Sequence, residues 1–368
     1  MKKIIEISKP IMEREEIDAV IKVLKSGRLS QGILVEKFEE EIARYCGTKY
    51  AVAVNSGTAA LHCALYGMGV KTGDEVITSP FTFIATTNAI LMQKAKPIFC
   101  DIKEDTFNID PSQIEKKITK KTKVILPISM YGHPYDVAEI NTITKNHKLR
   151  ILEDAAQSIG AEYKKRKTGS LADVTIFSLY ATKNITSGEG GVITTNNETV
   201  AKNCRIFRHH GQKENTNYEY ISLGYNYRMN DITAAIAIEQ LKKIERLIKI
   251  RRKNAKLLSQ GLTNITGFIL PAENPNYQDA FYQYTVRITN KFIVSREEFI
   301  RYLLSRGIIA RIYYPKPLHF YPHIKKLGYK IGDFPIAEKL AKEIVSLPVH
   351  PLVSENDINY IIKTIKMI

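Results

Sequence analysis

The sequence has few cysteines and no long apolar run. Its four cysteines, Cys46, Cys63, Cys100 and Cys204, lie far apart and form no C-x-x-C pair. A disulfide framework and a zinc site are therefore disfavoured, no metal site is predicted, and a reducing compartment fits. No apolar stretch reaches the roughly 18 residues of a membrane span. Residues 1–10 lack the apolar core of a signal peptide. We therefore expect a cytoplasmic protein with no membrane partner.

Two common nucleotide-binding motifs are also missing. The chain contains neither G-x-G-x-x-G nor the G-K-[ST] of a P-loop, which disfavours dinucleotide and ATP sites. Acidic residues are in deficit, because 38 Asp and Glu face 54 Lys and Arg, for a formal net charge of +16. Such an excess favours nucleic acid, an acidic membrane surface or a phosphorylated substrate. The basic runs, such as Lys164–Lys167, are scattered and match no nucleic-acid-binding motif, so we expect no nucleic-acid partner.

The pattern of the 368 residues predicts an α/β fold with two domains. Short apolar runs alternate with helical patterns through the first two thirds of the chain, which favours a mainly parallel sheet. Residues 190–195 form a strand that follows its predecessor too closely for a crossover helix, so one antiparallel neighbour is expected. A long helical pattern covers Ile232–Gln260, and capping boxes at Ser295 and Ser354 predict later helix starts. The other strand candidates are Tyr50–Val54, Glu75–Thr78, Pro97–Ile102, Thr122–Pro127, Leu149–Leu152 and Val174–Leu179.

Three polar features follow predicted strands in the first domain. Asp154 ends a buried strand, at the edge where open α/β sheets bind ligands, although a helix cap is an equal alternative. Lys183 lies in a loop of small residues whose hydroxyl and N–H groups can meet a phosphate; the alternative is a solvated surface lysine. Asn55–Ala60 joins a strand to a helix N-terminus, where free N–H groups favour an anion.

Pyridoxal 5'-phosphate (PLP) requires these parts together. A lysine amine holds it as a Schiff base, a carboxylate keeps its pyridine nitrogen protonated, and a phosphate cradle and a stacking side chain position it. Asp154 precedes Lys183 by 29 residues, with one predicted strand between them. The two side chains can therefore flank one cavity, and the sequence favours a PLP site.

Several strings in the sequence resemble the DegT/DnrJ/EryC1/StrS family of PLP-dependent sugar aminotransferases. The resemblance covers essentially the whole chain and implies fold type I, the aspartate aminotransferase-like fold. A large three-layer α/β domain is then expected over residues 1–250 and a small α+β domain over residues 251–368, with residues 1–14 packing on the small one. The strings are Asn55–Leu61, Glu153–Gln157, Ser178–Gly191 and Gly224–Met229.

The resemblance also implies roles for individual residues. Lys183 is expected to form the Schiff base and then to act as the proton-shuttling base, with Asp154 paired to the pyridine nitrogen and Gln157 beside the ring hydroxyl. The other implied cofactor contacts are Gly57, Thr58 and Ser178 on the phosphate and Phe83 on the ring face.

Some implied contacts keep an alternative. Phe83 could instead belong to the core. Asn226 matches a residue that reaches the phosphate from the neighbouring subunit, which implies a homodimer with sites at its interface. Tyr314 and His319 match a segment that approaches the active site, but packing roles fit both equally well.

The implied reaction is a ping-pong transfer with a pyridoxamine phosphate intermediate. L-Glutamate is the expected donor and a nucleotide-linked keto sugar the acceptor. The run Lys183–Gly191 is more similar to members that act on 4-keto-6-deoxy sugars than to 3-keto members, which remain an alternative. Dehydratases of this family carry His in place of the Schiff-base lysine, so Lys183 disfavours dehydration. A basic nucleic-acid-binding regulator is the remaining alternative.

Overall fold

The fold is built on a seven-stranded sheet in the order β1-β9-β8-β5-β4-β2-β3. The computed structural model describes residues 4–214 and 216–368. β9 pairs antiparallel with both β1 and β8, whereas the other pairs are parallel. The mainly parallel sheet and the reversed strand at residues 190–195 are thereby confirmed. The strands are β1 (Tyr50–Val54), β2 (Glu75–Thr78), β3 (Lys96–Phe99), β4 (Thr122–Ile125), β5 (Arg150–Asp154), β8 (Val174–Ser178) and β9 (Gly191–Thr195).

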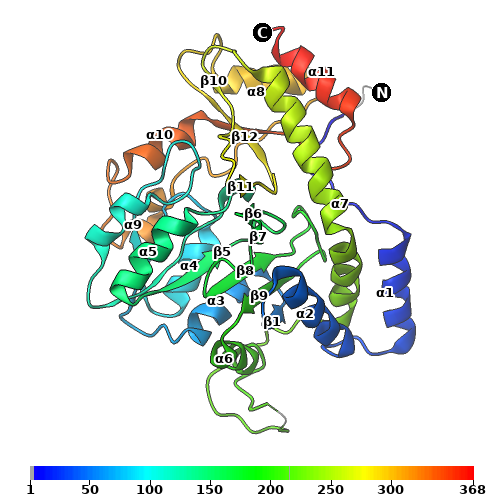
Figure 1. Cartoon of the computed structure of the whole chain (residues 1–368), viewed down its shortest axis with the longest axis vertical. Coiled ribbons are helices and arrows are strands. Elements are labelled where there is room, and N and C mark those ends of the chain that lie inside the picture. Colours follow the sequence, from blue (N-terminus) through cyan, green and yellow to red (C-terminus); the bar gives the residue numbers. More distant parts are fainter. Residues whose placement is uncertain (1–3, 215) are drawn as a thin grey trace.

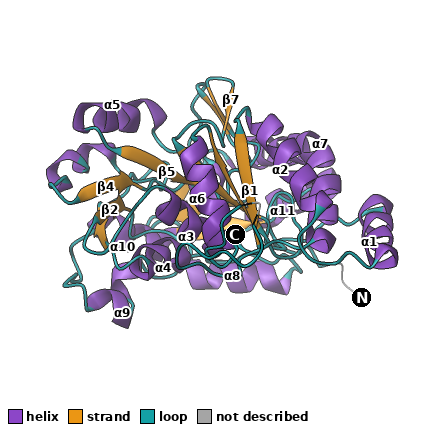
Figure 2. Ribbon diagram, turned by 90° about the horizontal axis from the view of Figure 1, so that it is seen from below, coloured by secondary structure: helices purple, strands orange, loops and turns teal. Residues whose placement is uncertain are grey.

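Helices cover both faces of this sheet and make a three-layer α/β body, as expected (Figures 1 and 2). Side chains alternate along each strand, so Val52 and Val54 of β1 pack among α3, α4 and α6, while Ala51 and Ala53 pack among α2 and α7. The helices of this part are α1 (Arg14–Ser26), α2 (Ile33–Cys46), α3 (Gly57–Gly67), α4 (Ile84–Met92), α5 (Val137–His147), α6 (Glu198–Arg208) and α7 (Asp231–Leu262), and the 3₁₀ turns are η1 (Pro111–Gln113), η2 (Glu115–Lys117) and η3 (Met130–Gly132).

The rest of the chain forms a smaller α+β region around a three-stranded antiparallel sheet, β10-β12-β13. The predicted capping boxes at Ser295 and Ser354 open α8 and α11. A further small sheet, β11-β6-β7, joins this region to the first. The elements are β6 (Glu162–Tyr163), β7 (Arg166–Lys167), β10 (Phe268–Ile269), β11 (Tyr277–Gln278), β12 (Tyr284–Ile288), β13 (Ile344–Leu347), α8 (Arg296–Ser305), η4 (Leu318–Phe320), α9 (Pro322–Lys325), α10 (Pro335–Glu343) and α11 (Glu355–Ile365).

Helix α7 extends along much of the long axis of the molecule and contributes to both regions (Figure 1). Its Ile248 packs with α2 and the large sheet, whereas its Ala255 belongs to the apolar cluster of the smaller region. Ile5 joins that second cluster, and its N–H donates to the Gly307 carbonyl over 2.8 Å. A division near residue 250, with the N-terminal segment on the smaller region, is therefore the domain arrangement that we propose.

Candidate functional site

A cavity of about 960 Å³ opens at the carboxyl ends of β5 and β8. It lies at the sheet edge where parallel α/β sheets bind ligands. Eight of the ten side chains singled out from the sequence line it: Gly57, Thr58, Phe83, Asp154, Gln157, Ser178, Lys183 and Tyr314. Thr58 and Lys183, which are 125 positions apart in the chain, thus line the same cavity, as the sequence pattern predicted.

Lys183 reaches the cavity from the loop between β8 and β9. Its Nζ lies 4.3 Å from the centre of the Tyr282 ring. Lys183 is half-buried and lines the cavity, so the alternative of a solvated surface lysine does not apply. A primary amine held inside a cavity can act as a nucleophile toward a carbonyl and as a proton carrier.

Asp154 lies on the neighbouring strand, at the last position of β5, with only 5% of its surface exposed. Its Oδ2 accepts a hydrogen bond of 2.7 Å from Thr86 Oγ1, and its Oδ1 accepts one of 3.2 Å from the N–H of Ala156. Burial raises the pKa of this carboxyl, while its hydrogen bonds and the charge of Lys183 act in the opposite direction. Within the described residues Asp154 has no ion-pair partner, so a cation bound in the cavity would stabilise its charged form.

The N-terminus of α3 supplies a cradle for an anion. Ser56 caps the helix by accepting from the Ala59 N–H, and no acidic residue occupies the first turn. Gly57 faces Ser178 so closely that a Cβ at position 57 would stand 3.0 Å from the Ser178 Cβ. The missing side chain leaves the first-turn N–H groups and the Ser178 hydroxyl open to one small group, such as a phosphate.

Two further lining residues flank this arrangement. Gln157 Oε1 accepts from the Tyr131 N–H over 3.0 Å, and its Nε2 donates to the Tyr314 hydroxyl over 3.1 Å. Gln157 is therefore held in one orientation beside Asp154. Phe83 precedes α4 and is 59% exposed, which rules out the core role that the sequence left open.

Two of the ten predicted residues lie elsewhere. His319 is fully buried in η4, and its Nε2 pairs with Glu338 at 2.9 Å, so it has the packing role that the sequence left open and does not reach the cavity. Asn226 is exposed on the segment between α6 and α7, where its carbonyl accepts from Asn55. It does not line the cavity of its own chain.

Several lining residues could not be anticipated from the sequence. They come from three separated segments: the N-terminal residues Glu6–Ser8, Tyr282 before β12, and the alternating set Ile309, Arg311 and Tyr313. Only the last set carried a signal, since every second side chain of an extended segment points the same way. Arg311 is exposed to the cavity, and no hydrogen bond or ion pair engages its guanidinium within the described chain.

The side chains that line the cavity fit PLP, the cofactor expected from the sequence. Three groups face one cavity: a reactive amine, a buried carboxylate that has no cationic partner among the described residues, and a helix N-terminus that a Cβ at position 57 would obstruct. These are the partners of an aldehyde, a protonated pyridine nitrogen and a phosphate. In residues 4–214 and 216–368 no three His, Cys, Asp or Glu side chains group as a metal site would require. No helix there is long and apolar enough to cross a membrane.

Known proteins match the chain along nearly its whole length. Residues 10–366 match the DegT/DnrJ/EryC1/StrS aminotransferase family. GDP-perosamine synthase of Caulobacter vibrioides is 35% identical over 99% of this chain and 98% of that protein. The dTDP-3-amino-3,4,6-trideoxy-alpha-D-glucose transaminase of Streptomyces venezuelae is 36% identical over 92% and 88%. The structure of Spr1654 from Streptococcus pneumoniae in its PMP form superimposes with a TM-score of 0.93 at 30% identity, over 99% and 97%.

Proposed function

The chain belongs to the DegT/DnrJ/EryC1/StrS aminotransferase family, and we propose that it transfers the amino group of L-glutamate to a nucleotide-linked 4-keto-6-deoxyhexose. The general activity follows from family membership. The chain is a PLP-dependent transaminase of fold type I that acts on nucleotide sugars in amino-sugar biosynthesis. The keto position, the donor, the residue roles and the subunit arrangement are the proposal.

In this proposal four features of the cavity hold the cofactor. Lys183 attaches it covalently, Asp154 faces its pyridine nitrogen, and Phe83 covers its ring. The first turn of α3 and Ser178 receive its phosphate. When bound, PLP supplies an electron sink for the negative charge that develops at the reacting carbon.

Lys183 moves the protons of both half-reactions. Its amine takes the proton from the donor α-carbon in the first half and delivers one to the former keto carbon of the sugar in the second. Asp154 keeps its negative charge through both halves and so stabilises the positive ring nitrogen. Because one cavity serves both substrates, the keto acid leaves before the sugar enters, which gives ping-pong kinetics.

The loop Lys183–Gly191 is the observation that carries the choice of a 4-keto-6-deoxy sugar. Its sequence is more similar to members that act on such sugars. Lys183 and Glu189 of this loop line the cavity, so these two residues face the space in which the substrate would bind. Thr186 Oγ1 donates to the Leu179 carbonyl over 3.0 Å, which folds the loop back onto the end of β8.

A substrate panel tests this assignment. Nucleotide-linked 4-keto and 3-keto sugars are each incubated with L-glutamate, and the amino sugar is detected by mass. We expect product from a 4-keto-6-deoxy sugar at a kcat/KM at least about tenfold above that of any 3-keto sugar. A higher kcat/KM for a 3-keto sugar would establish the second candidate function, a 3-keto sugar transaminase. One of the relatives, which is named for a 3-amino sugar, supports this candidate.

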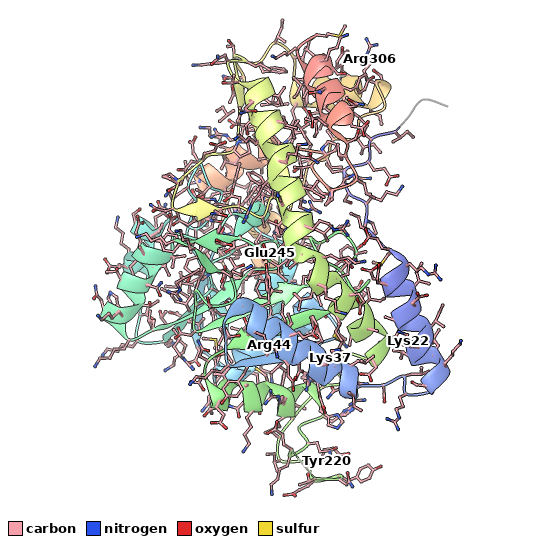
Figure 3. The ribbon with its side chains drawn as sticks, turned by 45° about the vertical axis from the view of Figure 1, so that its right-hand side comes forward. Lys22, Lys37, Arg44, Tyr220, Glu245 and Arg306 are labelled. Carbon is pink, nitrogen blue, oxygen red and sulfur yellow. The ribbon has the colours of Figure 1, made fainter. Side chains whose placement is uncertain are left out.

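A homodimer would complete the site with Asn226. The segment that joins α6 to α7 projects away from the body, as Tyr220 marks in Figure 3. Its apolar side chains are unusually exposed: Tyr218 is 83% and Leu223 73% accessible. Such a surface favours burial against a second copy, which would carry Asn226 toward the partner's cofactor phosphate.

Subunit complementation tests this arrangement. Lys183→Ala and Asn226→Ala chains are each expected to be inactive or weak, whereas a mixed dimer has one site with both native residues. Activity should return on mixing to about a quarter of the native value. No recovery in dimers shown to be mixed would contradict a shared site.

Two alternatives are weaker. A family dehydratase would carry His at position 183, and the chain has Lys there. Nucleic-acid binding explains none of the cavity residues. We keep the cytoplasm as the proposed location, because all four cysteines are buried and free.

A further inference from the structure

Tyr282 lies directly against the reactive lysine, and it is not among the proposed cofactor contacts. The Lys183 Nζ stands 4.3 Å from the centre of its ring. An ammonium group over an aromatic face is attracted by the negative potential of that face, so the ring offers the amine a docking position.

Both chain neighbours of Lys183 are tied to the segment that carries Tyr282. The hydroxyl groups of Thr182 and Tyr282 are hydrogen-bonded over 2.9 Å. On the other side, Asn184 Nδ2 donates to the Ala280 carbonyl over 3.2 Å. The lysine loop and the segment before β12 are therefore held in a fixed relation, with the amine and the ring between the two ties.

The backbone at Tyr282 is held by contacts that cost folding free energy. Arg251, only 4% exposed, donates from Nη1 to the carbonyls of Phe281 and Tyr282, each over 3.2 Å. Burial lowers the pKa of this guanidinium to about 10. Phe281 has a φ of +44°, a region that aromatic residues rarely adopt.

The chain also makes room for this segment. A Cβ on Gly132 would stand 2.8 Å from the Phe281 nitrogen and 2.9 Å from that of Tyr282. A buried guanidinium with no carboxylate partner among the described residues and a non-glycine residue at positive φ persist where the surrounding structure requires that geometry.

We propose that Tyr282 is a positioning residue for Lys183: its ring receives the amine whenever the amine is free in the cavity and keeps it aimed at the reacting carbon. The proposal rests on the proposed function, in which Lys183 must alternate between attachment and proton transfer. A lysine side chain has four rotatable bonds, so without a docking surface its amine samples many directions that are useless for proton transfer. The ring limits the directions that the amine samples, and it forms no covalent bond that would have to be broken.

The first test uses the full chain without cofactor and acetic anhydride as the probe. The labelling rate of Lys183 is followed by peptide mass for native protein, Tyr282→Phe and Tyr282→Leu. We expect the rate to rise about tenfold in Tyr282→Leu, which has no aromatic face, and to stay within about threefold of native in Tyr282→Phe, which keeps one. The same rate in all three proteins, or an equal rise in both variants, would overturn the proposal.

The second test follows the donor half-reaction by rapid absorbance measurements with ordinary and α-deuterated glutamate. Tyr282→Leu should slow proton transfer about tenfold and enlarge the deuterium isotope effect, while Tyr282→Phe stays within about threefold of native. Equal slowing in both variants, with no change in isotope effect, would assign Tyr282 a purely structural role.

A matched control and a folding check complete the design. Tyr163→Leu removes a ring from another lysine, Lys164, whose Nζ lies 5.3 Å from it outside the cavity, and should alter neither Lys183 readout. Circular dichroism and thermal midpoints establish that each variant is folded. The labelling test needs neither sugar nor donor, so it decides on Tyr282 even where glutamate produces no absorbance change and the proposed function fails.

Discussion

The two walls of the cavity are built in different ways. The sheet wall consists of Asp154, Ser178 and the first turn of α3, which lie at ends of regular elements, together with Lys183 in the loop that follows β8. The second wall consists of Glu6–Ser8, Tyr282 and the segment 309–314, which are irregular and far apart in sequence. On the sheet wall hydrogen bonds of regular structure fix the positions, whereas on the second wall single side chains such as Arg251 do so.

This difference separates two jobs. The cofactor chemistry is common to every substrate, so the rigid ends of buried strands suit it. The relatives are named for different sugars, and loop segments can change without disturbing the sheet. We therefore expect changes on the sheet wall to abolish the chemical step and changes on the second wall, apart from Tyr282 with its proposed role in aiming Lys183, to alter substrate binding.

The largest effect is expected from Lys183→Ala. The variant loses both the covalent attachment and the proton carrier, so kcat should fall by about 10⁴-fold or more. Cofactor binding itself should survive at reduced affinity, because Asp154 and the α3 N-terminus remain. The measurement is the glutamate-dependent absorbance change together with product mass. Activity within about a hundredfold of native would remove Lys183 from its proposed role.

Asp154→Asn comes next, with opposite effects on activity and stability. The amide keeps the shape and can still accept from Thr86, but it cannot balance a positive ring nitrogen, so kcat should fall by about 10²- to 10³-fold. Burial raises the pKa of the native carboxyl, so its charge costs folding free energy and its removal should raise the stability of the protein. Urea unfolding and steady-state kinetics check both signs. Joint loss of stability and activity would indicate a structural carboxylate instead.

The sheet wall was predictable from the sequence, whereas the second wall, apart from Tyr314, was not, for physical reasons. Strand ends show in local apolar patterns, so the sequence alone places Asp154 and Lys183 at one sheet edge. Tyr282 reaches the site through a positive φ at Phe281 and a contact with Arg251, neither of which leaves a local signature. For His319 the sequence left a substrate contact and a packing role equally open, and its pairing with Glu338 in the core favours the packing role.

Arg311 tests whether the second wall recognises the substrates. Its guanidinium faces the cavity without a protein partner in the described chain, and both substrates are anions. Arg311→Met should raise the KM of each substrate about tenfold and change kcat by less than about threefold, since ground-state binding is lost. Lys316→Met, a nearby exposed lysine outside the cavity, serves as the matched control. Unchanged KM values for both substrates in Arg311→Met would leave the second wall without its proposed role.

The smallest effect concerns how acid loosens the second wall. His350 is buried, and its Nε2–H donates to the Glu6 carbonyl over 3.0 Å while its Nδ1 accepts from the Leu352 N–H. Burial lowers the pKa of His350 from 6.5 to about 4. Between these values the unfolded chain binds a proton that the folded chain does not, so stability falls as the pH drops below 6.5, by about 2 kcal/mol at pH 5.

His350→Gln should remove this contribution, because glutamine can still donate to the Glu6 carbonyl but does not titrate. The loss of unfolding free energy between pH 7.5 and pH 5, measured in urea, should then be about 1–2 kcal/mol smaller than in the native chain. His62, whose pKa burial also lowers to about 4, keeps its own acid sensitivity in both proteins. His323→Gln at an exposed position is the control.

Hydrogen exchange at pH 5 should rise around Glu6–Ser8 before it rises in β5 and β8, because the hydrogen bond that His350 loses holds the second wall and not the sheet. Simultaneous exchange of both walls would show that they open as one unit.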